Sequence, residues 1–213
     1  MNSLKKFDAS FLTGNTKIIA GTDEAGRGPI AGPVVAAAVI FNKKTFHKDV
    51  NDSKKLSEKK REELFEWIIS NCISYGIGII SHEEIDEINI LQASLKAMGN
   101  AVDQLNKKPD LILIDGNKTF SSEIETKTIV KGDAKSFSIA AASIIAKVTR
   151  DKMMYEYSEK YPGYLWNKNK GYPTKAHIEA VRTFGITPLH RKTFLSKILE
   201  ESDEPFLFNA GSV

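Results

Sequence analysis

The stretch TKIIAGTDEAGRGPIAGPVVAAAVIF, residues 16–41, contains two apolar runs separated by a loop rich in glycine and proline. The first run predicts a β-strand that ends in a loop at two adjacent carboxylates, Asp23 and Glu24. The second run favours another strand, because β-branched side chains fit a pleated surface. Glycine-rich loops usually receive phosphates, which two neighbouring acids would repel. Either the loop is only a turn, or a positive charge belongs between acid and phosphate.

Working outward, the rest of the chain alternates between strand and helix patterns. Ser57 is a candidate N-cap, and Ser81 stands three residues before Glu84, the spacing of a capping box. Further strands are expected in residues 74–80, 110–116 and 126–133. A helix after Ser57 should carry an apolar stripe at Leu64, Phe65, Trp67 and Ile68. Further helical patterns begin at Ser81 and occupy residues 90–105 and 138–161, with a turn and a helix in 171–185 and a final helix after Pro188. The small residues in 138–161 predict that something packs closely against that helix. This order predicts an α/β or α+β domain with one mixed sheet covered by helices.

Composition places the chain among ordinary soluble globular proteins. Its 213 residues suit one large domain, and the formal net charge is only +3. Cys72 is the single cysteine, which excludes an intramolecular disulfide and fits a reducing compartment. The N-terminus lacks the apolar run of a signal peptide, and no apolar stretch approaches the length of a membrane span, so we expect a cytoplasmic protein.

Three of the apolar runs end in acids, namely Asp23 with Glu24, Asp115 and Asp133. If the three strands are neighbours, four carboxylates meet at one edge of the sheet, where they would not all ionise unaided. Hard divalent cations such as Mg²⁺ and Mn²⁺ prefer oxygen ligands and often hold a substrate phosphate as well. Two such ions would support phosphodiester cleavage. The alternative is that each acid only caps a helix or forms a turn.

The segment GRGPIA, residues 26–31, also satisfies the loose dinucleotide-binding pattern G-x-G-x-x-G/A. That pattern requires a helix after the glycines, whereas Pro29, Pro33 and the following valines favour a strand. A dinucleotide-dependent oxidoreductase therefore remains a rival, to be tested by cofactor binding.

Five longer motifs resemble bacterial ribonuclease HII in order and spacing. They are GTDEAGRGPIAGPVVAAAVI, LILIDGNK, VKGDAKSFSIAAASIIAKVTRD, KGYPTKAH and GITPLHRKTF, and together they extend from about Lys17 to about Phe194. The related ribonuclease HIII carries another residue between the two glycines and a longer N-terminal extension. Arg27 and the short N-terminus therefore favour the HII type.

The resemblance implies a ribonuclease H-like fold with a mixed central sheet, flanking helices and a C-terminal helical part. It also implies an endonuclease that hydrolyses the RNA strand of RNA–DNA hybrids and nicks duplex DNA 5′ of a single embedded ribonucleotide. Catalysis would use two divalent ions, Mn²⁺ or Mg²⁺, and would leave 5′-phosphate and 3′-hydroxyl ends. A rival is a hybrid-binding module without catalysis, which would bind but not cut.

The family's catalytic and metal-binding acids match Asp23, Glu24, Asp115 and Asp133. The resemblance further implies that Gly26, Arg27 and Gly28 contact the 2′-hydroxyl and the adjacent phosphate, and that Tyr172 stacks on the next sugar.

Several basic residues are candidates for contact with nucleic acid. Lys54, with Lys55 as the alternative, is expected to meet a phosphate. Lys147 and Arg150 face either the duplex or solvent.

His190, Arg191 and Asp151 also match positions of the family. His190 with Arg191 serves proton transfer, phosphate binding or packing, and Asp151 is expected at a helix surface or in packing.

We expect a lead-in at residues 1–16, a catalytic domain at 17–200 with C-terminal helices from about 174, and a mobile acidic tail at 201–213. The expected partners are RNA–DNA hybrids and DNA duplexes containing ribonucleotides. No membrane is expected among them, and the family suggests a monomer.

Overall fold

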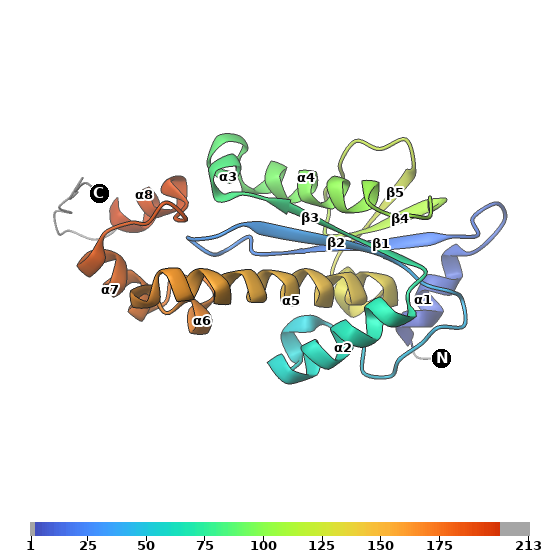
Figure 1. The fold of residues 1–213 in the computed structure, drawn as a ribbon. Coiled ribbons are helices and arrows are strands. Elements are labelled where there is room, and N and C mark those ends of the chain that lie inside the picture. Colours follow the sequence, from blue (N-terminus) through green and yellow to red (C-terminus); the bar gives the residue numbers. More distant parts are fainter. Residues whose placement is uncertain (1–2, 201–213) are drawn as a thin grey trace.

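The computed structural model describes residues 3–200 and contains a mixed β-sheet with helices on both faces (Figure 1). The predicted mobile tail at 201–213 lies outside the described residues. β1 pairs antiparallel with β2 and parallel with β4, so the sheet is mixed, as the sequence predicts. The strands follow the order β3-β2-β1-β4-β5 and are β1 (Ile19–Ala25), β2 (Val34–Ile40), β3 (Ser74–Ile80), β4 (Leu111–Asp115) and β5 (Glu125–Ile129).

Helices cover the two faces of the sheet unequally. The long helix α5 (Phe137–Lys160) lies along β1 and β2, with α2 (Glu58–Asn71) packed against it (Figure 1). On the opposite face, α3 (His82–Ile88) leads into α4 (Ile90–Asp103), which lies over β3 and β2. The remaining elements are α1 (Ser3–Phe11), η1 (Ser53–Lys55), η2 (Gly132–Ala134), η3 (Pro162–Tyr164), α6 (Trp166–Asn169), α7 (Lys175–Phe184) and α8 (Lys192–Glu200).

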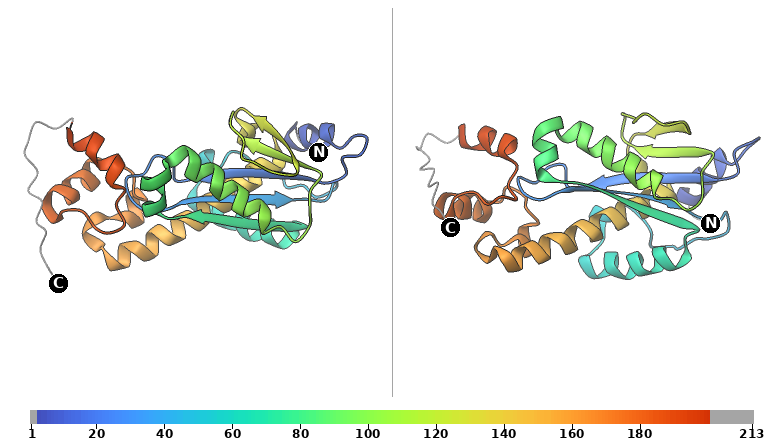
Figure 2. Two further views of the ribbon diagram at one scale, coloured as in Figure 1. Left: turned by 90° about the horizontal axis from the view of Figure 1, so that it is seen from above. Right: turned by 45° about the horizontal axis from the view of Figure 1, so that its top comes forward.

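The C-terminal helices form a separate layer at one end of the molecule. Figure 2 shows α7 and α8, in orange and red, beyond one end of the sheet, with α1, in dark blue, at the other. Their apolar side chains, with those of η3 and the end of α5, bury Tyr164, Trp166 and Val181. This end of the molecule therefore has its own hydrophobic cluster.

Two predicted helix starts are confirmed. Ser57 Oγ accepts a hydrogen bond from the Lys60 amide at 3.2 Å, and Ser81 Oγ accepts one from the Glu84 amide at 3.3 Å. These bonds satisfy amide groups that the first turn of a helix leaves without intrahelical partners. Local sequence was sufficient to place both helices.

The close packing predicted for the long helix is also confirmed. Ala140, Ala141 and Ala142 are fully buried in α5. A Cβ atom at Gly21 of β1 would collide with the backbone of Ser138 and Ile139. Strand and helix thus approach so closely that no side chain fits between them at Gly21.

Helix α1 was not anticipated, because the sequence indicated only a lead-in at residues 1–16. Its Asp8 is buried and accepts hydrogen bonds from Ser136 Oγ at 2.6 Å and from the Ser138 amide and hydroxyl at 2.9 and 2.8 Å. Burial raises the pKa of Asp8, although the bonds from both serines oppose that shift. The first residues of the chain therefore satisfy the N-terminus of α5.

Candidate active site

Asp23 and Asp115 lie on neighbouring parallel strands. Thr22 of β1 pairs with Ile114 of β4, so the next residue on each strand is an aspartate. The expectation that β1 ends at its acids is confirmed, because the strand ends at Ala25, directly after Glu24. Asp23 and Glu24 still continue the ladder, opposite Ala37 and Ala36 of β2. The longer antiparallel pairing with β2 extends the strand through both carboxylates.

Asp133 reaches the same region by another route. The prediction of a strand that ends in this acid was wrong, because β5 ends at Ile129 and Asp133 lies in the single turn η2. Lys131 adopts the left-handed conformation, with φ 57°, and redirects the chain between them. The Gly132 amide then donates to Asp115 Oδ1 at 2.6 Å, so η2 is attached to the carboxylate at the end of β4.

Burial and mutual repulsion dominate the electrostatics of Asp23. Its side chain is only 4% exposed and faces α5, where the Ser143 hydroxyl donates to it. Burial, followed by the charges of Glu24 and Asp115, raises the pKa of Asp23 well above its ordinary value. Additional positive charge nearby would therefore stabilise the ionised form of Asp23.

Glu24 and Asp115 show the same tendency, with partial compensation. Burial raises the pKa of Glu24, while Arg27, at 3.3 Å from its carboxylate, opposes the shift. Burial also raises the pKa of Asp115, the Gly132 amide opposes it, and the charge of Asp133 adds to it. The four carboxylates together thus carry more negative charge than the adjacent cations neutralise.

Lys54 is the lysine that faces these acids. Its Nζ lies 3.6 Å from Asp133 Oδ2, whereas Lys55 pairs with Asp52 at 4.0 Å. Burial lowers the pKa of Lys54, but the charges of Asp133 and Asp23 outweigh that effect, so the pKa is raised. The side chain is 80% exposed and remains free to turn toward a ligand.

The turn η1, which carries Lys54, is held in place by buried and half-buried polar groups. Arg61 Nη1 donates to the carbonyl groups of Ser53 and Leu56 at 3.1 and 2.6 Å. The Ser53 and Ser143 hydroxyls are 2.9 Å apart, and Ser143 also contacts Asp23. Lys54 and the carboxylates are therefore parts of one connected network.

The donor chemistry of this site fits a hard divalent cation. All four candidate ligands are carboxylates, and the raised pKa values of Asp23, Glu24 and Asp115 reflect a deficit of positive charge. Within residues 3–200, however, no three His, Cys, Asp or Glu side chains are already arranged as a metal cage. Successive side chains of a strand point to opposite faces, which separates Asp23 from Glu24. An ion bound here would have to draw the carboxylates together.

The predicted substrate loop lies beside Tyr172. Gly26 has φ +101°, and a side chain there would collide with Arg150. A Cβ on Gly28 would lie 3.4 Å from Tyr172 Cε1. Tyr172 is 42% exposed, so its ring and the backbone of Gly28 present a shared accessible surface.

Two arginines have roles that the sequence did not reveal. Arg150 is 1% exposed and donates to the Ala31, Pro33 and Lys170 carbonyls, so the expectation that it faces duplex or solvent was wrong. Arg191 is fully buried behind the 26–33 loop, where its donors meet only backbone carbonyls. The spacing of these arginines along the chain carries no signal of those contacts.

His190 belongs to the hydrophobic end of the molecule. It is 1% exposed and contacts His177 and Thr187, and none of its hydrogen bonds reaches the four acids. Of the roles considered from sequence, packing is the one its position supports. His177, from the KGYPTKAH motif, lies beneath Tyr172 and its Nδ1 is 2.9 Å from the Tyr172 carbonyl.

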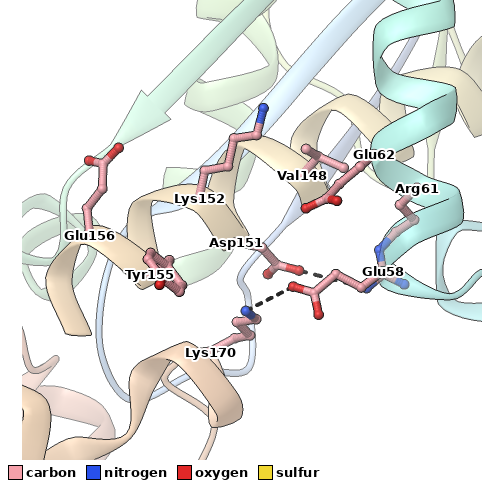
Figure 3. Close-up of a pocket in the computed structure, with 9 residues that line it drawn as sticks. All are labelled: Glu58, Arg61, Glu62, Val148, Asp151, Lys152, Tyr155, Glu156 and Lys170. Carbon is pink, nitrogen blue, oxygen red and sulfur yellow. Dashed lines mark hydrogen bonds and ion pairs between the residues drawn. The ribbon is translucent and has the colours of Figure 1, made fainter. Parts of the chain in front are cut away.

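A pocket of about 310 Å³ lies between α2, α5 and the turn at Lys170 (Figure 3). Asp151 approaches Arg61 at 3.9 Å across it and binds Lys147 at 2.6 Å, while Lys170 pairs with Glu58 at 3.2 Å. These ion pairs support the packing role expected for Asp151 and leave Lys147 turned toward it. None of the four candidate acids lines this pocket.

The fold corresponds to a known class. The crystal structure of ribonuclease H2 from Pyrococcus horikoshii OT3 superposes with a TM-score of 0.71 at 30% identity, over 86% of this chain and 98% of that one. Bst-RNase HIII in complex with Mn²⁺ shares the fold, with a TM-score of 0.62 at 18% identity over 87% and 70% of the two chains. The architecture is therefore ribonuclease H-like, with acids on its adjacent central strands.

Sequence comparison defines the family. The family model described as Ribonuclease HII matches residues 20–197. A Ribonuclease HII from Clostridioides difficile is 58% identical over 85% of this chain and 71% of its own length, and one from Endomicrobium trichonymphae is 55% identical over 91% and 92%. The chain belongs to the ribonuclease HII family, and it is accordingly a ribonuclease H enzyme. Among helices between residues 3 and 200, none has the length and hydropathy needed to cross a membrane.

Proposed function

We propose that this protein is an endonuclease that cleaves the RNA strand of RNA–DNA hybrids and nicks duplex DNA 5′ of a single embedded ribonucleotide. The observation that carries the proposal is the adjacency of Asp23 and Asp115 on β1 and β4. Asp133 and Lys54 join them at one side, and Glu24 follows Asp23 toward the glycine loop. Membership of the ribonuclease HII family supports the choice of substrate.

Asp23, Glu24, Asp115 and Asp133 would hold two divalent ions, Mg²⁺ or Mn²⁺. The ions would supply a water activated for attack and stabilise the departing 3′ oxygen, which leaves 5′-phosphate and 3′-hydroxyl ends. A protein of the same fold, Bst-RNase HIII, has been solved in complex with Mn²⁺. The excess of carboxylate over cationic charge is the property of this chain that supports the assignment.

The protein's own groups would orient the nucleic acid. Lys54 can leave Asp133 for a backbone phosphate, because its side chain is largely exposed. The backbone of Gly26, Arg27 and Gly28 approaches the 2′-hydroxyl, which is the group that distinguishes RNA from DNA at one nucleotide. Tyr172, whose ring lies beside Gly28, would stack on the neighbouring sugar.

A direct test uses a labelled DNA duplex that contains one ribonucleotide, incubated with Mg²⁺, Mn²⁺ or EDTA. We expect one nick 5′ of the ribonucleotide with either ion and none with EDTA. An all-DNA duplex of the same sequence is the control. Binding without cleavage in Mn²⁺ would instead favour the hybrid-binding module. A nick 5′ of the ribonucleotide would support a role in removing ribonucleotides from DNA. We further propose that the protein acts as a monomer in the cytoplasm.

A further inference from the structure

The loop at residues 26–33 turns most of its carbonyl groups toward two buried guanidinium groups. All five N–H donors of Arg191 are used, at 2.7 to 3.2 Å, on the carbonyls of Gly26, Arg27, Pro29, Gly32 and Pro33. Arg150 binds the Ala31 and Pro33 carbonyls from an adjacent position, at 3.0 and 2.9 Å. Among the side chains described between residues 3 and 196, no carboxylate forms an ion pair with either arginine.

Such an arrangement has an electrostatic cost. Burial lowers the pKa of Arg191 to about 9 and that of Arg150 to about 10, and the charge of Arg150 adds to the shift at Arg191. Both groups nevertheless remain charged at neutral pH. Two buried cations with only backbone carbonyls as hydrogen-bond partners create a positive region directly behind the loop.

The inward carbonyls determine where the loop's amides point. In a trans peptide the C=O of one residue and the N–H of the next point in opposite directions. Because the Gly26 and Arg27 carbonyls point inward to Arg191, the amides of Arg27 and Gly28 point outward. Neither amide has a hydrogen-bond acceptor among the described residues.

Arg150 connects this loop to the segment that carries Tyr172. Its Nη1 donates to the Lys170 carbonyl at 2.8 Å, and the Ile30 amide donates to the Gly171 carbonyl at 2.9 Å. The outward amides and the exposed tyrosine ring are therefore held in a fixed relationship by one buried network.

We propose that Arg191, assisted by Arg150, is a positioning residue that holds the Arg27 and Gly28 amides outward to bind the sugar–phosphate backbone at the ribonucleotide. This proposal rests on the proposed function and adds the group responsible for its discrimination between RNA and DNA. Arg191 acts through the loop and touches no substrate atom.

The test measures discrimination, since a general loss of stability would not change it. Dissociation constants are measured in EDTA, without cleavage, for a duplex with one ribonucleotide and for the all-DNA duplex of the same sequence. The variants are Arg191→Met, which keeps length but removes every donor, and Arg191→Lys, which keeps only the charge. Ile68→Ala, in the apolar contact of α2 with the sheet and α5, is the control for lost stability.

We expect Arg191→Met to reduce the ratio of the two dissociation constants about tenfold, the loss of roughly one or two hydrogen bonds. Arg191→Lys should reduce this ratio by a smaller factor. Ile68→Ala should keep the wild-type ratio, measured at a temperature where all three variants are folded. If Arg191→Met does not fold, Arg191→Lys and Arg150→Lys provide the measurement. An unchanged ratio in the folded arginine variants would overturn the proposal. A wild-type protein that shows no discrimination would instead contradict the proposed function.

Discussion

His190 should make the protein less stable in mild acid. Its Nδ1 accepts a hydrogen bond from the Thr187 amide at 2.9 Å, so that nitrogen carries no proton. The proton on Nε2 therefore points toward His177 Nε2, at 3.2 Å, which also accepts from Trp166 at 2.9 Å. A second proton on His190 would face the Thr187 amide hydrogen inside a buried cluster.

The size of the effect follows from proton linkage. Burial, followed by the charge of His177, lowers the pKa of His190 from 6.5 to about 3. Between these values the unfolded chain binds a proton that the folded protein does not, so stability falls as pH falls. The free energy of unfolding falls by up to about 1.4 kcal/mol per pH unit once the pH is well below 6.5. Because the slope is smaller above pH 6.5, the total loss between pH 7.5 and 5.5 is also about 1.4 kcal/mol.

The measurement has to separate His190 from the carboxylates. Raised pKa values at Asp8, Asp23 and Asp115 act in the opposite direction, because a folded protein that binds their protons gains stability in acid. We therefore compare the wild type with His190→Gln, whose amide can still accept from Thr187 and donate to His177.

Urea denaturation followed by circular dichroism at pH 7.5 and 5.5 gives the free energy of unfolding of both proteins. The advantage of the wild type over His190→Gln should shrink by about 1.4 kcal/mol on acidification. A difference that stays constant to within about 0.5 kcal/mol would refute the neutral, buried state of this histidine.

Three further substitutions test separate parts of the molecule. Asp115→Asn should abolish nicking in Mn²⁺ while hybrid binding in EDTA persists, and near wild-type cleavage would remove the metal assignment. Lys54→Ala should weaken hybrid binding and reduce the slope of log K against log salt by about 1, whereas an unchanged slope would argue against a phosphate contact. Gly21→Ala should cost about 1–3 kcal/mol or more in urea denaturation, because the added methyl group meets the backbone of Ser138; equal stability would mean that strand and helix can separate there.

Local signals were sufficient for most elements of the fold. Ser57 and Ser81 marked helix starts because an N-cap acts on amides only two or three residues away. The apolar run at β4 identified a buried strand because burial on both faces leaves no alternation, and the β-branched residues of β2 favoured a strand. Such features depend on neighbours in sequence, which a single chain displays directly.

Elements defined by distant partners could not be predicted in the same way. Helix α1 was not predicted, and its Asp8 meets partners 128 and 130 residues away. The position of Asp133 depends on a left-handed turn at Lys131, a conformation that lysine rarely adopts. The interior position of Arg191 depends on carbonyls about 160 residues earlier, and nothing in its own sequence context distinguishes it from a surface arginine.

The contact of Asp8 with Ser136 and Ser138 has a consequence for synthesis of the chain. During translation the N-terminal segment emerges first, but the donor groups at the start of α5 do not exist until more than 120 further residues have been added. The carboxylate of Asp8 therefore remains exposed to water until α5 has been synthesised. Deleting the first dozen residues should leave the carboxylate site chemically complete, yet expose the start of the longest helix to water.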